Sequence, residues 1–187
     1  MAVAYKLRGD DEKKIVFDSK IAKRKAAIQR YCWNNEQQFY FDYDFNSGNQ
    51  TTLQTIAAVF PLFFGIASLQ QATAIAARIE NLFLKPGGVT TTLEMSGQQW
   101  DAPNGWAPLQ WVTIKGLENY GMHALAKEIA ERWIALNKKV YQRTGKLMEK
   151  YNVYDTNLDA GGGEYPSQDG FGWTNGVLLK LINIYEK

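Results

Sequence analysis

Apolar residues recur with a helical period along most of this chain, and strand-like alternation is weak throughout. Asp18 and Ser19 are N-cap candidates for an early helix, and Pro108 suits the first turn of a later one. Gly145 is expected to kink the longest helical stretch. The pattern predicts helices at residues 18–33, 52–67, 69–84, 107–121, 123–151 and 171–185.

The segments between these helices differ in character. Residues 34–50 are turn-rich around a short aromatic and acidic run, which predicts at most a short extended piece. Residues 85–106 and 152–170 form long loops, the second of them rich in glycine. We therefore expect an all-α array of paired helices, in the manner of an α/α toroid or solenoid. Because 187 residues suffice to bury a core, residues 1–187 are expected to form a single domain.

Charge and hydropathy favour neither a nucleic acid nor a membrane as partner. The net charge is +2, and the basic cluster Lys20, Lys23, Arg24 and Lys25 fits a solvated helix face. The apolar run at residues 56–67 is too short to span a bilayer and indicates a buried, kinked helix. The first residues turn charged before any leader-like apolar run, so we expect no signal peptide and a cytoplasmic location.

Cysteine and histidine are each present once, and this limits the chemistry. Cys32 cannot form an internal disulfide and is expected to be a small buried thiol. His123 is expected at a surface position near a helix N-terminus, since no nucleophile-elbow pattern accompanies it. We expect neither a metal site nor a cofactor.

Two loops concentrate aromatic rings, carboxylates and glycines: "QWDAPNGWAPLQW" at residues 99–111 and "GGGEYPSQDGFGWTNG" at residues 161–176. Sugars present hydroxyls for hydrogen bonds and apolar faces for stacking, and their hydrolysis uses paired carboxyl groups. The glycine run lacks the lysine and hydroxyl residues of a phosphate-binding loop. The carboxylate candidates, for which a loop salt bridge or an Asx-turn is the alternative, are Asp101, Glu149, Glu164 and Asp169.

The tryptophans divide by position. Trp111 and Trp133 lie inside predicted helices and are expected in the core. Trp100, Trp106 and Trp173 lie in loops or at helix starts beside glycine or proline, which favours stacking against a ligand.

These motifs resemble the trehalase family. The first loop resembles its Gln-Trp-Asp-x-Pro-x-Gly-Trp-x-Pro signature, at Gln99, Trp100, Asp101, Pro103, Gly105, Trp106 and Pro108. The second resembles its glycine-rich Glu-Tyr-Pro to Gly-Phe-Gly-Trp-Thr-Asn-Gly block, and "EKY" at residues 149–151 fits between them. The resemblance runs from about residue 20 onward. It implies an inverting glycoside hydrolase with an (α/α)6 toroid that cleaves α,α-trehalose to two glucoses without a metal.

The resemblance also implies residue roles. Glu149 corresponds to the general base that activates water. The expected substrate-binding residues are Trp100, Asp101, Asn104, Trp106, Glu164 and Phe171.

The chain departs from the family pattern in length. The upstream motif that carries the general acid, and the upstream arginine cluster, are not found in these 187 residues. The resemblance therefore implies the C-terminal part of a trehalase, unable to turn over trehalose at an enzyme's usual rate alone. Such a part is expected to self-associate or to pair with the missing N-terminal half. The alternatives are a non-catalytic α/α module that binds a saccharide or a partner chain, and a purely structural helical fragment.

Overall fold

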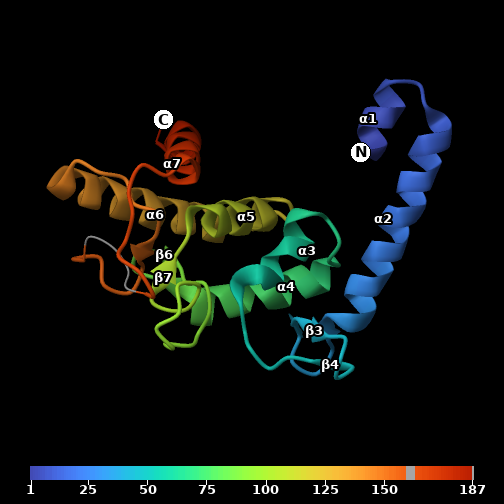
Figure 1. The fold of residues 1–187 in the computed structure, drawn as a ribbon, viewed down its shortest axis with the longest axis horizontal. Helices are drawn as coiled ribbons and strands as arrows, with labels where there is room; N and C mark the ends of the chain where they lie inside the picture. The colour runs from blue at the N-terminus through green and yellow to red at the C-terminus, as the bar shows by residue number, and fades with distance from the viewer. Residues whose placement is uncertain (159–162, 187) are drawn as a thin grey trace. The chain divides into compact units, whose positions relative to one another are not determined.

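The computed structural model describes residues 1–158 and 163–186 and is mainly helical (Figure 1). It divides into two compact units, residues 1–52 and 53–187, which are described separately below. Short paired strands accompany the helices in both units. The expectation of an all-α chain is therefore correct for the helices, but it did not include these strand pairs. The expectation of a single domain stays a prediction.

The first unit begins its main helix earlier than the sequence pattern predicts. Helix α2 starts after Asp10, whose carboxylate accepts a hydrogen bond from the backbone N–H of Lys13 at 3.1 Å. Asp18 was expected as an N-cap but lies inside the helix, where it pairs with Lys14. The basic cluster is exposed, as predicted. The elements of this unit are α1 (Ala2–Leu7), α2 (Asp11–Tyr31), β1 (Trp33–Asn34), β2 (Phe39–Tyr40), β3 (Tyr43–Asp44) and β4 (Asn49–Gln50).

The stretch predicted as a helix at residues 52–67 is instead broken into short pieces. Thr55 is extended and bridges to Thr92, and a 3-10 turn, η1 (Ile56–Val59), and the short α3 (Phe60–Phe63) follow. The chain then turns at Gly65, whose φ of +61° suits a residue without a side chain. An apolar run without a polar face does not show where the chain must turn, and this explains the wrong prediction.

The next predicted helix is confirmed. Helix α4 (Leu69–Arg78) begins with a capping box between Ser68 and Gln71 and continues into a π-helical turn, η2 (Ile79–Phe83). The chain then folds into a hairpin of β5 (Leu84–Lys85) and β6 (Gly88–Val89).

Helix α5 (Ala107–Glu118) lies at the centre of the second unit and packs against α3, α6 (His123–Thr144) and α7 (Gly172–Tyr185). At Gly116 an added Cβ would lie 3.2 Å from both the Leu62 Cβ and the Phe63 nitrogen, so glycine permits the close approach of α5 and α3. The largest fully buried side chains of this unit are Trp106, Trp133, Tyr151, Phe83, Lys150, Ile56, Leu62, Ile75, Ile79, Ile114 and Leu117.

Helix α6 ends earlier than predicted. Gly145 was expected to kink a helix that continues to residue 151, but it adopts the left-handed conformation, with φ of +70°, and ends the helix. Residues 146–150 are therefore not helical. β8 (Tyr151–Asn152) follows and pairs with β7 (Asn104–Gly105), while α7 confirms the final predicted helix. Within the described residues, no helix is both long and apolar enough to cross a membrane.

Candidate active site

The three sequence segments singled out for their chemistry lie together in the second unit. The first meets the second where Asn104 pairs with Asn152 and Gly105 pairs with Tyr151. The second meets the third where Met148 bridges to Asp169. The loop at residues 99–106, the bend at residues 148–151 and the stretch at residues 163–173 therefore form one site. Gly161 and Gly162 of the glycine-rich motif lie outside the described residues.

Glu149 lies at the centre of this site and is 5% exposed. Its Oε1 accepts a hydrogen bond from the Tyr165 hydroxyl at 3.0 Å, and its Oε2 lies 3.4 Å from the Lys150 ammonium. Its backbone N–H donates to the Gln168 carbonyl at 2.8 Å, and its carbonyl accepts from the Trp173 indole at 3.3 Å. The sequence pattern placed Glu149 at a helix end. It lies instead in a bend fixed by these downstream partners.

Four aromatic rings cover one side of the site. Trp100 and Trp106 stack with centroids 3.9 Å apart and planes 7° from parallel. Trp173 meets Trp106 edge-on at 5.8 Å, and Phe171 stacks on Trp173 at 5.3 Å. Trp100 is 48% exposed and Trp173 is 38% exposed, whereas Trp106 is 1% exposed. Trp106 was expected to stack on a ligand, but in this chain it is buried beneath Trp100 and supports it.

Gln99 links the tryptophan loop to the glycine-rich segment. Its backbone carbonyl accepts hydrogen bonds from the Trp106 indole at 3.2 Å and from the Asn104 amide at 3.1 Å. Its side-chain amide donates to the Tyr165 carbonyl at 3.4 Å, and its backbone N–H donates to the exposed Glu164 carboxylate at 3.4 Å. A Cβ added at Gly163 would lie 2.6 Å from the Gln99 side chain. Glycine at position 163 therefore permits this close approach.

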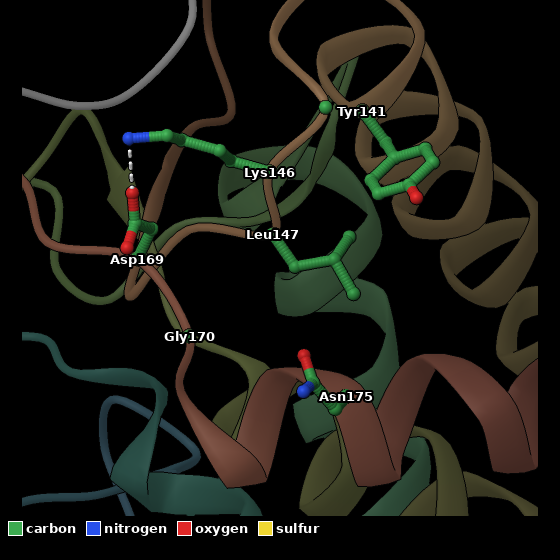
Figure 2. Close-up of a pocket in the computed structure, with 7 residues that line it drawn as sticks. Tyr141, Lys146, Leu147, Asp169, Gly170 and Asn175 are labelled. Atoms are coloured by element: carbon green, nitrogen blue, oxygen red, sulfur yellow. Dashed lines mark ion pairs between the residues drawn. The ribbon is translucent and has the colours of Figure 1, made fainter.

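Two of the four candidate carboxylates are already bound by nearby protein side chains. Asp101 accepts hydrogen bonds from the Thr92 hydroxyl at 2.9 Å and from the Ser96 hydroxyl. Asp169 forms an ion pair with Lys146 at 2.6 Å, drawn in Figure 2, and this contact raises the pKa of Lys146. For Asp169 the structure shows the salt bridge that the sequence left as the alternative.

The hollow in Figure 2 lies beside the Met148–Asp169 bridge and has a volume of about 360 Å³. It is lined by Tyr141, Gly145, Lys146, Leu147, Asp169, Gly170 and Asn175. A second hollow of about 270 Å³ adjoins the tryptophan loop and is lined by Met95, Gly97, Gln98, Ala102, Pro103, Asn104 and Gly163. Glu149 lines neither, so neither hollow by itself is the candidate active site.

Two tyrosines next to Glu149 remain protonated at neutral pH. Partial burial raises the pKa of Tyr165, and its hydrogen bond to Glu149 together with the charges of Glu149 and Glu164 raises it further. Burial raises the pKa of Tyr151 to about 12, against a smaller lowering by the N–H of Met148, which donates to its hydroxyl oxygen. Tyr165 is therefore available as a donor to the Glu149 carboxylate.

Sequence reasoning missed Gln99, Lys150 and Tyr165 as members of the site. Each is adjacent in sequence to a residue that was singled out. A lysine or tyrosine beside a carboxylate is nevertheless usually solvated. The burial of Lys150 and the hydrogen bond from Tyr165 to Glu149 result from the tertiary fold.

Cys32 and His123 lie apart from Glu149 in the chain and take no part in its hydrogen bonds. Cys32 was expected to be buried but is half-buried, and this burial raises the pKa of its thiol. His123 is the exposed first residue of α6, as expected. Among residues 1–158 and 163–186, no group of three or more histidine, cysteine, aspartate or glutamate side chains is arranged to hold a metal ion.

A family model described as Trehalase matches residues 1–186. The chain is 45% identical to the periplasmic trehalase of Citrobacter koseri and 46% identical to that of Salmonella agona, each over 184 residues. The aligned part is 98% of this chain and 32% of each relative, so the chain spans about a third of their length.

Two solved structures also match. The neutral trehalase from Saccharomyces cerevisiae superposes with a TM-score of 0.76 at 25% identity, over 91% of this chain and 30% of its own. A GH63 mannosylglycerate hydrolase from Thermus thermophilus in complex with glucose gives 0.74 at 23% identity, over 98% and 43%. The second likeness concerns the fold alone.

Proposed function

Because the chain belongs to the trehalase family, we propose that it supplies the general base and part of the sugar site of an inverting glycosidase that hydrolyses α,α-trehalose to two glucose molecules. The observation that carries the proposal is the buried carboxylate of Glu149, which the Tyr165 hydroxyl holds in the same site as the exposed Trp173 ring, whose indole donates to the Glu149 carbonyl. Hydrolysis of a glycosidic bond uses such a carboxylate as one of a pair of carboxyl groups, and exposed aromatic rings can stack against a sugar.

In this mechanism, ionised Glu149 takes a proton from a water molecule that attacks the anomeric carbon. Its Oε1 is oriented by the Tyr165 hydroxyl, so the base meets the water in a defined direction. A general acid from outside these 187 residues protonates the leaving oxygen. The two carboxyl groups of an inverting pair lie about 6.5–9.5 Å apart, which leaves room for the water.

The substrate-binding residues fall into two groups. Trp100, Phe171 and Glu164 present exposed or half-exposed side chains to the site, and we assign them to direct contact with the sugar. Asp101, Asn104 and Trp106 hold the loop through internal hydrogen bonds and ring stacking. In this assignment they act on the sugar by positioning Trp100.

The remaining expectations concern the complete fold, the location of the protein and the need for a metal or cofactor. The chain would form part of an (α/α)6 toroid, and its partner would be the upstream part of the same fold. The names of the curated relatives include the word periplasmic, which favours the periplasm over the cytoplasmic location expected from the sequence. Neither a metal nor a cofactor is needed for this mechanism.

The test is a coupled assay for glucose released from trehalose. The chain alone should show no turnover near the roughly 10 s⁻¹ that is typical of enzymes. Co-production with the upstream part of a periplasmic trehalase should restore activity. In the restored enzyme, Glu149→Gln should lower kcat at least about 10²-fold with binding largely kept. Glu164→Gln should weaken binding at least as much as it slows the chemical step.

Asp169→Asn is the matched control, because that carboxylate pairs with Lys146, and it should retain activity. Near-full turnover in Glu149→Gln together with its loss in Glu164→Gln would exchange the two roles. Trehalose binding without turnover in the restored complex would favour the alternative, a non-catalytic saccharide-binding module. Glucose release by the chain alone at an ordinary enzyme rate would contradict the dependence on an upstream part.

A further inference from the structure

Lys150 is a fully buried cation, with 0% of its surface exposed. Its ammonium lies 3.4 Å from Glu149 Oε2, 4.8 Å from the centroid of the Tyr165 ring and 5.8 Å from that of Trp106. Lysine is almost never fully buried unless its charge is paired. Its position therefore requires a reason, and the contacts supply one.

The chain bends at residues 149 and 150, and this bend lets two consecutive side chains meet. A buried carboxylate and a buried ammonium are each costly alone, and an opposite charge at close range offsets much of that cost. The two ring faces add a favourable electrostatic environment for the cation. The carboxylate and the rings thus hold the ammonium against one side of Glu149.

We infer that Lys150 is a positioning residue of the active site, whose buried charge pairs with the Glu149 carboxylate and holds it in the orientation a general base requires. The inference rests on the proposed function for its catalytic meaning. Tyr165 fixes Oε1 of the carboxylate and Lys150 lies beside Oε2. Both oxygens are therefore held from the protein side.

Other charged and titratable groups lie near Glu149. Tyr165 and Glu164 come from the glycine-rich segment, and the Lys146–Asp169 pair lies at the neighbouring bridge. Glu164 is exposed, and the Lys146 and Asp169 side chains are 59% and 44% exposed. Solvent therefore screens their influence more strongly than that of the buried Lys150.

The first test measures the ionisation of Glu149 directly in the 187-residue chain. The side-chain carboxyl carbon is followed by ¹³C NMR from acid to neutral pH, and its signal is identified by its loss in Glu149→Gln. Lys150→Met removes the charge and keeps most of the volume. It should raise the titration midpoint of this signal, because the loss of a buried opposite charge disfavours the ionised carboxylate.

Two further variants sharpen this result. Lys150→Arg keeps the charge and should restore most of the parent midpoint. Lys146→Met removes an exposed lysine nearby and should move the midpoint by less than about twofold in the ionisation constant. An unchanged midpoint in folded Lys150→Met, or an equal shift in Lys146→Met, would overturn the proposal.

A second test covers the case in which Lys150→Met does not fold. If its defect is the uncompensated charge of Glu149, the double variant Glu149→Gln/Lys150→Met should be more stable to urea than Lys150→Met alone. If the Lys150→Met protein were equally unstable with Glu or with Gln at position 149, the two residues would not be coupled, and the proposal would fail. Neither test uses trehalose, so a failure of the proposed function can be distinguished from a failure of this inference.

Discussion

Gln110 provides the most direct test of how the hairpin beside the active site is held. This side chain is fully buried in α5. Its Oε1 accepts a hydrogen bond from the Val89 N–H at 2.8 Å, and its Nε2 donates to the Val89 carbonyl at 2.7 Å. The amide therefore satisfies both backbone groups of one residue of β6. Gln110→Met keeps a similar shape and removes both hydrogen bonds.

The expected loss of stability follows from these two contacts. A buried backbone donor or acceptor without a partner costs about 1–3 kcal/mol. Two such groups at Val89 give about 2–6 kcal/mol, and the more apolar methionine offsets a small part of this. Since a typical domain is stable by about 5–15 kcal/mol, the change should be large.

Urea unfolding followed by tryptophan fluorescence measures this change from the midpoint and the slope. The matched control is Gln70→Met, because Gln70 is exposed on α4. The control should change stability by no more than about 0.5 kcal/mol. If Gln110→Met were as stable as this control, the amide would not hold the hairpin and the reasoning would be wrong.

Two other results are expected. Because burial raises the pKa of Tyr151 to about 12, its contribution to stability is present below about pH 10 and is lost as the pH rises from about 10 through about 12. Tyr151→Phe should therefore flatten the pH dependence of the urea midpoint in that window, and an unchanged slope would contradict this origin. The chain should also self-associate or bind a hydrophobic dye, since Phe64 and Leu69 are 61% and 66% exposed; light scattering from a stable monomer without dye binding would count against this.

Local signals predicted most helices of the second unit. Pro108 in the first turn of α5 and the periodic pattern of α4 and α7 were sufficient, and the structure confirms these helices. The start of α2 was wrong because Asp10 and Asp18 carry the same capping signal, and only the wider fold selects between them. Gly145 is similarly ambiguous, since glycine fits both a kink and a left-handed end.

The sequence predicted which segments form the candidate site, but it did not predict how their side chains are arranged. The motifs around Trp100, Glu149 and Glu164 do lie together, as their shared chemistry suggested. The burial of Trp106 and Lys150 depends on stacking and pairing between segments distant in sequence. No local pattern reports such contacts, so a stacking role for Trp106 was expected and Lys150 was missed.

The contacts of Glu149 also determine when the site can form during synthesis of the chain. The groups that hold Glu149 and its neighbour Met148 come from residues further along the chain. Tyr165, Gln168 and Trp173 hold Glu149, and Thr174 bonds the Met148 carbonyl at 2.8 Å. During synthesis from the N-terminus, residue 149 therefore leaves the ribosome before its downstream partners. Its carboxylate lacks the Tyr165 hydroxyl, and its carbonyl lacks the Trp173 indole, until those residues have emerged, so this part of the site is among the last parts of the second unit to form.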